Sequence, residues 1–184
     1  PVEGWEKEEI EILLRYANKY PLSDYFPKIS TFPKKLKKYL KNNSIKRYKT
    51  NNGCLKGLIK QMVIDDDLDY TILGLHILET YGKNFTSIDV GKEWLSHLPY
   101  DRVYTAEKIA YKNLINGMQP PLTAKYKNPY KEWIGAQIRA DIWGYVSPGK
   151  PEFAAKLAFK DASLSHTGEG IYGEVFFSSA IAYA

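Results

Sequence analysis

Cysteine is nearly absent from this chain, and several signatures of other protein classes are missing altogether. The single cysteine, Cys54, cannot form an internal disulfide, which favours a reducing, cytoplasmic setting. No apolar run reaches the roughly 18 residues of a membrane-spanning helix, and the acidic, polar start of the chain lacks the pattern of a signal peptide. The three histidines lie far apart in sequence, which excludes a Cys/His zinc finger. The sequence therefore predicts no membrane partner.

The chain also lacks the alternating pattern of β-strands and any internal repeat. Apolar residues recur instead at helical spacing. We expect helices over residues 6–18, 33–41, from 69 to about 81, 87–97, 105–116, from 151 onward, and from about 170 to the end. Residues 132–143 are expected to form a helix or an irregular helical segment. The predicted fold class is all-α.

Some boundaries follow from local residue chemistry. We expect Gly82 to end the helix that follows Asp69, Ser87 or Asp89 to cap the next one, and Pro151 to open another. The helix after Asp69 is apolar most of the way round, which predicts burial inside a larger helical domain. Loops are expected at residues 42–44, 51–53 and 120–121.

The net charge of +5 is unevenly placed. Eight basic residues crowd one short stretch: Lys34, Lys35, Lys37, Lys38, Lys41, Lys46, Arg47 and Lys49. A solvated basic surface is the favoured interpretation, and a nucleic-acid patch ranks last because no aromatic stacking platform interleaves with the lysines. Residues 28–60 are predicted to be a basic, mobile insertion that is poor in core residues.

Carboxylates gather in the segment Asp65-Asp66-Asp67-Leu68-Asp69. They repel one another unless a cation lies among them, and the positive end of the following helix also stabilises them. The segment therefore predicts either helix capping with solvated charge or a site for a hard divalent cation such as Mg²⁺. An EF-hand is excluded because Tyr70 falls where glycine is needed and His76 where glutamate is needed.

Four segments, in order along the chain, carry a family resemblance. The segments EWIGAQIRAD (132–141) and DASLSHTGEGIYGE (161–174) resemble active-site segments of the ADP-ribosylglycohydrolase family. The segment DDDLDYT (65–71) looks like a form of that family's first metal motif, and PVEGW (1–5) is similar to the residues that follow its opening glycine-rich helix. The resemblance covers most of the chain and is weak only around residues 30–60.

The resemblance implies a single multi-helix orthogonal bundle over residues 1–184, two Mg²⁺ ions, and hydrolysis of the glycosidic bond between ADP-ribose and a protein side chain or small molecule. The positions that match the family's site are Asp66 and Asp67 (catalytic and metal-binding), Asp65 (metal-binding, where the family usually has Thr or Ser), and Gly135, His166, Tyr172 and Glu174 (substrate-binding). Structural interpretations remain open for several of these and neighbouring residues: a tight turn at Gly135, a structural His166, pairing of Arg139 and Asp141 with each other or with neighbouring residues, and a structural Glu107.

The chain also departs from the family pattern. Glu169 stands where asparagine is common, and the opening glycine-rich helix and the downstream Asp-x-Asp-Ser/Thr metal motif do not occur. We therefore expect sequence to be missing at both ends and metal binding to be weak. The alternative hypothesis is a catalytically incomplete helical module that binds ADP-ribose or a partner protein, or forms an oligomer through its apolar C-terminal helix.

Overall fold

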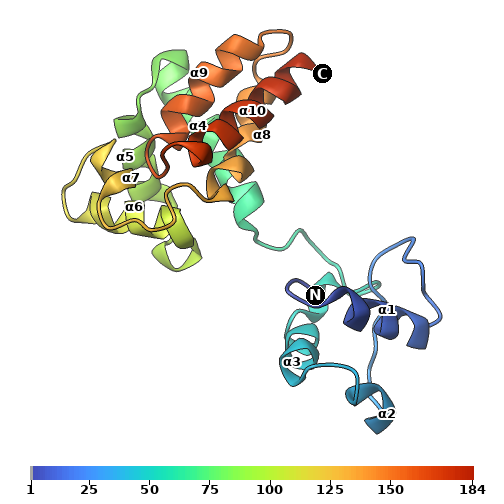
Figure 1. The fold of residues 1–184 in the computed structure, drawn as a ribbon. Helices are drawn as coiled ribbons and strands as arrows, with labels where there is room; N and C mark the ends of the chain where they lie inside the picture. The colour runs from blue at the N-terminus through green and yellow to red at the C-terminus, as the bar shows by residue number, and fades with distance from the viewer. Residues whose placement is uncertain (1) are drawn as a thin grey trace. The chain divides into compact units, whose positions relative to one another are not determined.

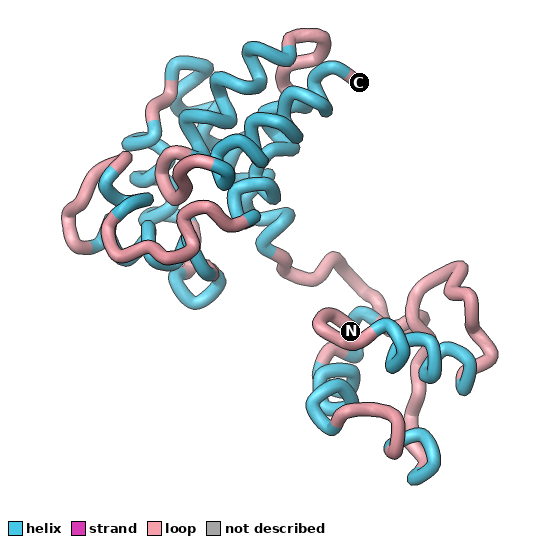
Figure 2. The backbone as a smooth tube through the Cα atoms, in the orientation of Figure 1, coloured by secondary structure: helices cyan, strands magenta, loops and turns pink. Residues whose placement is uncertain are grey.

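The computed structural model describes residues 2–184, apart from the side chain of Asn52, and it is all-helical (Figures 1 and 2). The described residues contain no strand, which confirms the predicted fold class. The chain divides into two compact units, Pro1–Val63 and Ile64–Ala184. Pro1, the first residue of the PVEGW segment, lies outside the described residues. No described helix is both long and apolar enough to cross a membrane.

The first unit contains α1 (Lys7–Tyr16), α2 (Lys34–Lys37), α3 (Asn42–Thr50) and the 3₁₀ turn η1 (Asn52–Cys54). Its apolar core is formed by Trp5, Leu13, Phe32, Leu36, Leu40, Ile45, Tyr48 and Leu55. Six of these core residues lie within 28–60, so the prediction that this segment is poor in core residues is wrong. The prediction of a loop at residues 42–44 is also wrong, because α3 begins at Asn42.

A buried carboxylate explains why α3 can begin at Asn42. Glu9 of α1 is only 5% exposed and accepts a 2.6 Å hydrogen bond from the backbone N–H of Lys41, the residue that caps α3. The Ser44 hydroxyl donates to the other carboxylate oxygen at 3.3 Å. A helix start leaves N–H groups without partners, and here a residue distant in sequence supplies the acceptor. The lysines of α2 and α3 lie on the exposed side, as a solvated basic surface would.

The second unit holds the remaining helices. They are α4 (Asp66–Tyr81), α5 (Ser87–His97), α6 (Thr105–Ile115), α7 (Leu122–Lys125), α8 (Ala140–Tyr145), α9 (Pro151–Ala162) and α10 (Glu169–Tyr183), with 3₁₀ turns η2 (Gly82–Asn84), η3 (Tyr100–Arg102) and η4 (Ile134–Arg139). Their core includes Leu73, Ile77, Phe85, Trp94, Trp143 and Leu157. Helix α10 packs against α9, α8 and η4, and α4 packs against η4 and α8 (Figure 1).

Local chemistry sets the boundaries of these helices. Gly82 ends α4 with a φ of 64°, and Pro151 occupies the first turn of α9, both as predicted. Thr86, rather than Ser87 or Asp89, is the N-cap of α5, and Asp89 completes a capping box with it. The short helix α7 directly follows the loop predicted at 120–121.

Helix α4 is less buried than its composition predicts. Tyr70, Leu73 and Ile77 face the core, whereas Ile72 and Leu75 are 66% and 46% exposed. A close approach to α8 fixes the buried side, because a Cβ added at Gly74 would lie 2.5 Å from Ile142 Cγ2. Burial therefore follows one face of α4, and the apolar residues on the other face remain at the surface.

Candidate active site

The acidic segment forms the start of α4. Asp65 is the N-cap, in an extended conformation (φ −147°, ψ 140°), and its Oδ1 accepts a 3.1 Å hydrogen bond from the backbone N–H of Asp67. Asp65, Asp66 and Asp67 can each present one carboxylate oxygen so that these oxygens lie within 4.8 Å of one another. The capping interpretation is thus correct for Asp65, and it leaves room for the cation-binding interpretation.

The electrostatics of the cluster favour a cation. Partial burial raises the pKa of Asp66, and repulsion from Asp67 and Asp65 adds to the shift. A raised pKa means that the carboxylate is harder to ionise in the folded protein than in water. A hard cation held by these oxygens would remove the repulsion, and carboxylate oxygens are the ligands that Mg²⁺ prefers. The donor set therefore fits a magnesium ion.

A buried ionic network surrounds Arg139, at the end of η4. Its Nη1 donates to Glu107 Oε1 at 2.9 Å, and its Nε to Asp161 Oδ2 at 2.5 Å. Its Nη2 donates to Ser165 Oγ at 3.0 Å and lies 3.5 Å from Glu174 Oε2. All four ionisable side chains are at most 5% exposed. Arg139 thus joins α6, α9 and α10. Of the two structural alternatives, pairing with neighbouring residues is correct, and the described residues show no ion pair between Arg139 and Asp141.

The network carries more acidic than basic groups. Burial raises the pKa of Glu107, although Arg139 counteracts the shift. Burial also raises the pKa of Glu174 well above its usual range, and the nearby Asp161 adds to that shift. One guanidinium faces three carboxyl groups, so we expect Glu174 to hold a proton at neutral pH. The structural interpretation of Glu107 is consistent with its role as a buried partner of Arg139.

Two aromatic rings connect the network to the acidic segment. The Arg139 guanidinium lies 5.2 Å from the ring centroid of Trp94 and 5.5 Å from that of Tyr70. Tyr70 follows Asp66 by about one turn of α4. Burial is the main cause of the raised pKa of the Tyr70 hydroxyl, followed by the charge of Glu107, and the charge of Asp66 makes a smaller contribution. The start of α4 and the Arg139 network therefore belong to one region of the second unit.

His166 is buried beside the network and is neutral. Its Nδ1 lies 2.8 Å from Ser165 Oγ, and its Nε2 lies 3.9 Å from Glu107 Oε1. Burial, with a contribution from Arg139, lowers the pKa of His166 to about 3. Two candidate residues of the sequence, His166 and Gly135, thus meet at Glu107.

Gly135 lies against Glu107 because it has no side chain. A Cβ at this position would lie 2.5 Å from Glu107 Oε1 and 2.6 Å from Oε2. Gly135 does not have the positive φ that favours glycine, so close packing rather than a tight turn requires glycine here. Its half-buried backbone remains a candidate for contact with a ligand.

Tyr172 and Glu174 occupy different environments on α10. Tyr172 is 62% exposed, whereas Glu174 is fully buried in the Arg139 network. The two side chains therefore do not form one surface. Asp161 and Ser165 are network members that the sequence analysis did not assign to the site, although both fall within the block 161–174. Their position in that block was the one sequence feature that could have indicated a role in the site.

Comparisons with known proteins add no assignment. Neither a protein-family model, nor a curated protein, nor a solved structure matches this chain.

Proposed function

We propose that this chain is a magnesium-dependent hydrolase of the ADP-ribosylglycohydrolase type, which cleaves the glycosidic bond between ADP-ribose and a protein side chain or small molecule. The observation that supports this most is that the segments carrying the family resemblance pack together in the second unit. The blocks 132–141 and 161–174 pack together through η4, α9 and α10, and α4, which carries the acidic segment, packs on η4. Segments far apart in the sequence thus meet in the second unit.

The start of α4 supplies the metal-binding part of the proposal. Asp65, Asp66 and Asp67 would hold the ion through one oxygen each. Bound Mg²⁺ would supply Lewis-acid chemistry that orients and polarises the ribose hydroxyls. The positive end of the α4 dipole adds to the attraction for the carboxylates, which keeps the cluster in place before the ion binds.

The protein groups would perform the proton transfer. Asp66 would serve as the general base, a role that carboxylates commonly fill. It would accept a proton from the water that attacks the anomeric carbon, where positive charge develops. The carboxylate of Asp67 would stabilise that charge. The Gly135 backbone and His166 are the proposed substrate contacts, and the Arg139 network would hold their segments rigid.

The test is release of ADP-ribose from ADP-ribosylated arginine, ADP-ribosylated serine and small-molecule conjugates, with Mg²⁺ and with chelator. We expect magnesium-dependent release that Asp66→Asn lowers by at least about 100-fold, the lower range for loss of a general base. The matched control is Asp101→Asn, an exposed carboxylate of η3, which should retain activity. Release that persists in chelator, or that Asp66→Asn leaves unchanged, would contradict the proposed mechanism.

One observation favours the alternative, a non-catalytic binding module. Helix α10 exposes Phe176, Phe177 and Tyr183 at 66%, 45% and 83%, and exposed aromatic side chains of this kind are common at protein interfaces. Calorimetric titration with ADP-ribose separates the two functions. Binding without turnover of any conjugate would favour the module, and self-association lost in Phe176→Ser would identify α10 as an oligomer interface.

A further inference from the structure

A second group of metal-ligating side chains lies away from the start of α4. His76 of α4 and the residues Glu93 and His97 of α5 point toward one another. Glu93 Oε2 lies 3.1 Å from His76 Nε2 and 2.9 Å from His97 Nδ1. One ligand atom from each of the three residues falls within 4.8 Å of the others. The two histidines, far apart in sequence, have ring centroids only 4.7 Å apart.

We propose that His76, Glu93 and His97 form a zinc site with an open coordination position at the mouth of the adjacent pocket. The proposal does not depend on the hydrolase function. Two imidazoles and one carboxylate are a donor set that zinc uses where one position remains for water or substrate. Imidazole ligands also favour a transition metal over Mg²⁺.

The spacing of the donor atoms fits a tetrahedral zinc ion. Zinc bonds to nitrogen and oxygen are about 2.0–2.2 Å long, which places two ligand atoms of a tetrahedron about 3.3 Å apart. The observed N–O separations of 3.1 and 2.9 Å are close to this value. Since both nitrogens approach the same carboxylate oxygen, a small outward movement of the half-exposed histidines would admit the ion.

The surrounding residues prepare Glu93 as a ligand. The Tyr81 hydroxyl donates a 2.6 Å hydrogen bond to Glu93 Oε1, so Oε2 is the oxygen presented to the histidines. Hydrogen bonds to a ligand from a neighbouring group orient it and tune its affinity. Residues Glu93 and His97 are also four apart on α5, so one helix face presents both.

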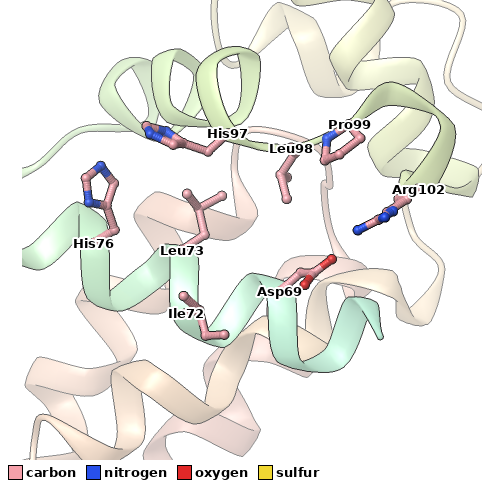
Figure 3. Close-up of a pocket in the computed structure, with 8 residues that line it drawn as sticks. All are labelled: Asp69, Ile72, Leu73, His76, His97, Leu98, Pro99 and Arg102. Carbon is pink, nitrogen blue, oxygen red and sulfur yellow. The ribbon is translucent and has the colours of Figure 1, made fainter. Parts of the chain in front are cut away.

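The pocket gives the site access to solvent. Its volume is about 400 Å³, and its lining includes His76 and His97 together with Leu73 and Leu98. Figure 3 shows the two histidines at one end of the pocket and Asp69 and Arg102 at the other. The imidazole side chains are 42% and 51% exposed, whereas Glu93 is 9% exposed. A zinc ion would thus be bound to a buried carboxylate on one side and would face the pocket on the other.

Calorimetric titration of Zn²⁺ into the chelator-treated full chain tests the proposal. We expect binding of one ion that His76→Ala and His97→Ala each weaken by more than about 100-fold, and that Tyr81→Phe weakens by about 10-fold. Cobalt(II) binding at the same site should give visible absorption bands typical of imidazole ligation, and both histidine variants should abolish them.

Two controls make the result decisive. The triple variant Asp65→Asn, Asp66→Asn, Asp67→Asn should keep the zinc affinity, because those carboxylates belong to the other cluster. Both histidines are partly exposed, so their variants should keep the circular dichroism spectrum and melting temperature of the parent chain. Absence of zinc binding, binding unaffected by the histidine variants, or loss of zinc binding in the aspartate variant would overturn the proposal.

Discussion

Arg139 should be the residue whose loss destabilises the second unit most. Replacement by methionine keeps much of the side-chain length but leaves Glu107, Asp161 and Glu174 without a cationic partner, each with a side chain at most 5% exposed. Removing one partner of a buried ion pair costs about 3–5 kcal/mol of folding free energy. Because three carboxyl groups lose the same partner, we expect a value at the upper end, about 5 kcal/mol. Protonation of one of them limits the loss.

The measurement is urea unfolding followed by tryptophan fluorescence. Trp94 packs 5.2 Å from the guanidinium and belongs to the second unit, so its emission reports on this region. A Trp5→Phe background removes the one tryptophan of the first unit. The matched control is Arg102→Met, an exposed arginine that should change the free energy of unfolding by less than about 0.5 kcal/mol. A loss below about 1 kcal/mol in Arg139→Met would refute the reasoning.

The pH dependence supplies a second check with a definite sign. The pKa values of Glu107 and Glu174 are raised in the folded state above the ordinary glutamate value of 4.5. Above that value the unfolded chain releases protons that the folded chain retains, so these two groups lower stability as the pH rises. Loss of the Arg139 charge raises both pKa values further. The variant should therefore differ from the parent chain more at pH 8 than at pH 5.

Three further substitutions test other parts of the fold. Asp65→Ala should destabilise the start of α4 by about 1 kcal/mol through loss of the N-cap, whereas Asp65→Asn should preserve it; thermal unfolding of the two variants gives the comparison. Gly135→Ala should destabilise the second unit by about 1–3 kcal/mol in urea unfolding, because the new Cβ would lie 2.5 Å from Glu107 Oε1; an unchanged midpoint would show that η4 shifts to make room. Glu9→Ala should remove about 2 kcal/mol from the first unit by leaving the N–H of Lys41 without its acceptor, with faster amide exchange in α3 as the readout. The pKa of Glu9 is lowered in the folded state, so the parent chain should lose this contribution as the pH falls below about 4.5.

The helices of the second unit could be predicted because their signals are local. Pro151 and Gly82 act through their own backbone conformations. Helical spacing identified both ends of α5 and α6 within a residue, and Pro151 identified the start of α9. The start of α3 could not be found in this way. Its N-terminal residues form a helix because Glu9, distant in sequence, accepts from the N–H of Lys41. A polar stretch such as Asn42-Asn43-Ser44 gives no local sign of such a partner.

The candidate site was partly accessible from sequence for the same reason. Residue type and spacing identified the acidic segment, since three adjacent carboxylates need no tertiary contact to be close. The partners of Arg139 lie on three other helices, and only the packing of η4 with those helices brings them together. The pairing of His76 with His97 likewise depends on how α4 packs against α5. Its one local sign was the four-residue spacing of Glu93 and His97 on a helix face.

The polar groups around Arg139 are incompletely satisfied, and this supports a functional origin for the network. Tyr70 Oη, His166 Nε2 and both Glu174 carboxylate oxygens are buried without a hydrogen-bond partner in the part of the chain that the structure describes. Each such group costs about 1–3 kcal/mol, and native proteins keep few of them. An apolar core of the same volume would be as stable or more stable. Four of the seven such atoms in the described residues lie around Arg139, and the others are Trp5 Nε1, Trp143 Nε1 and Ser147 Oγ. We infer that the four are kept by selection for what this region binds more than by selection for stability.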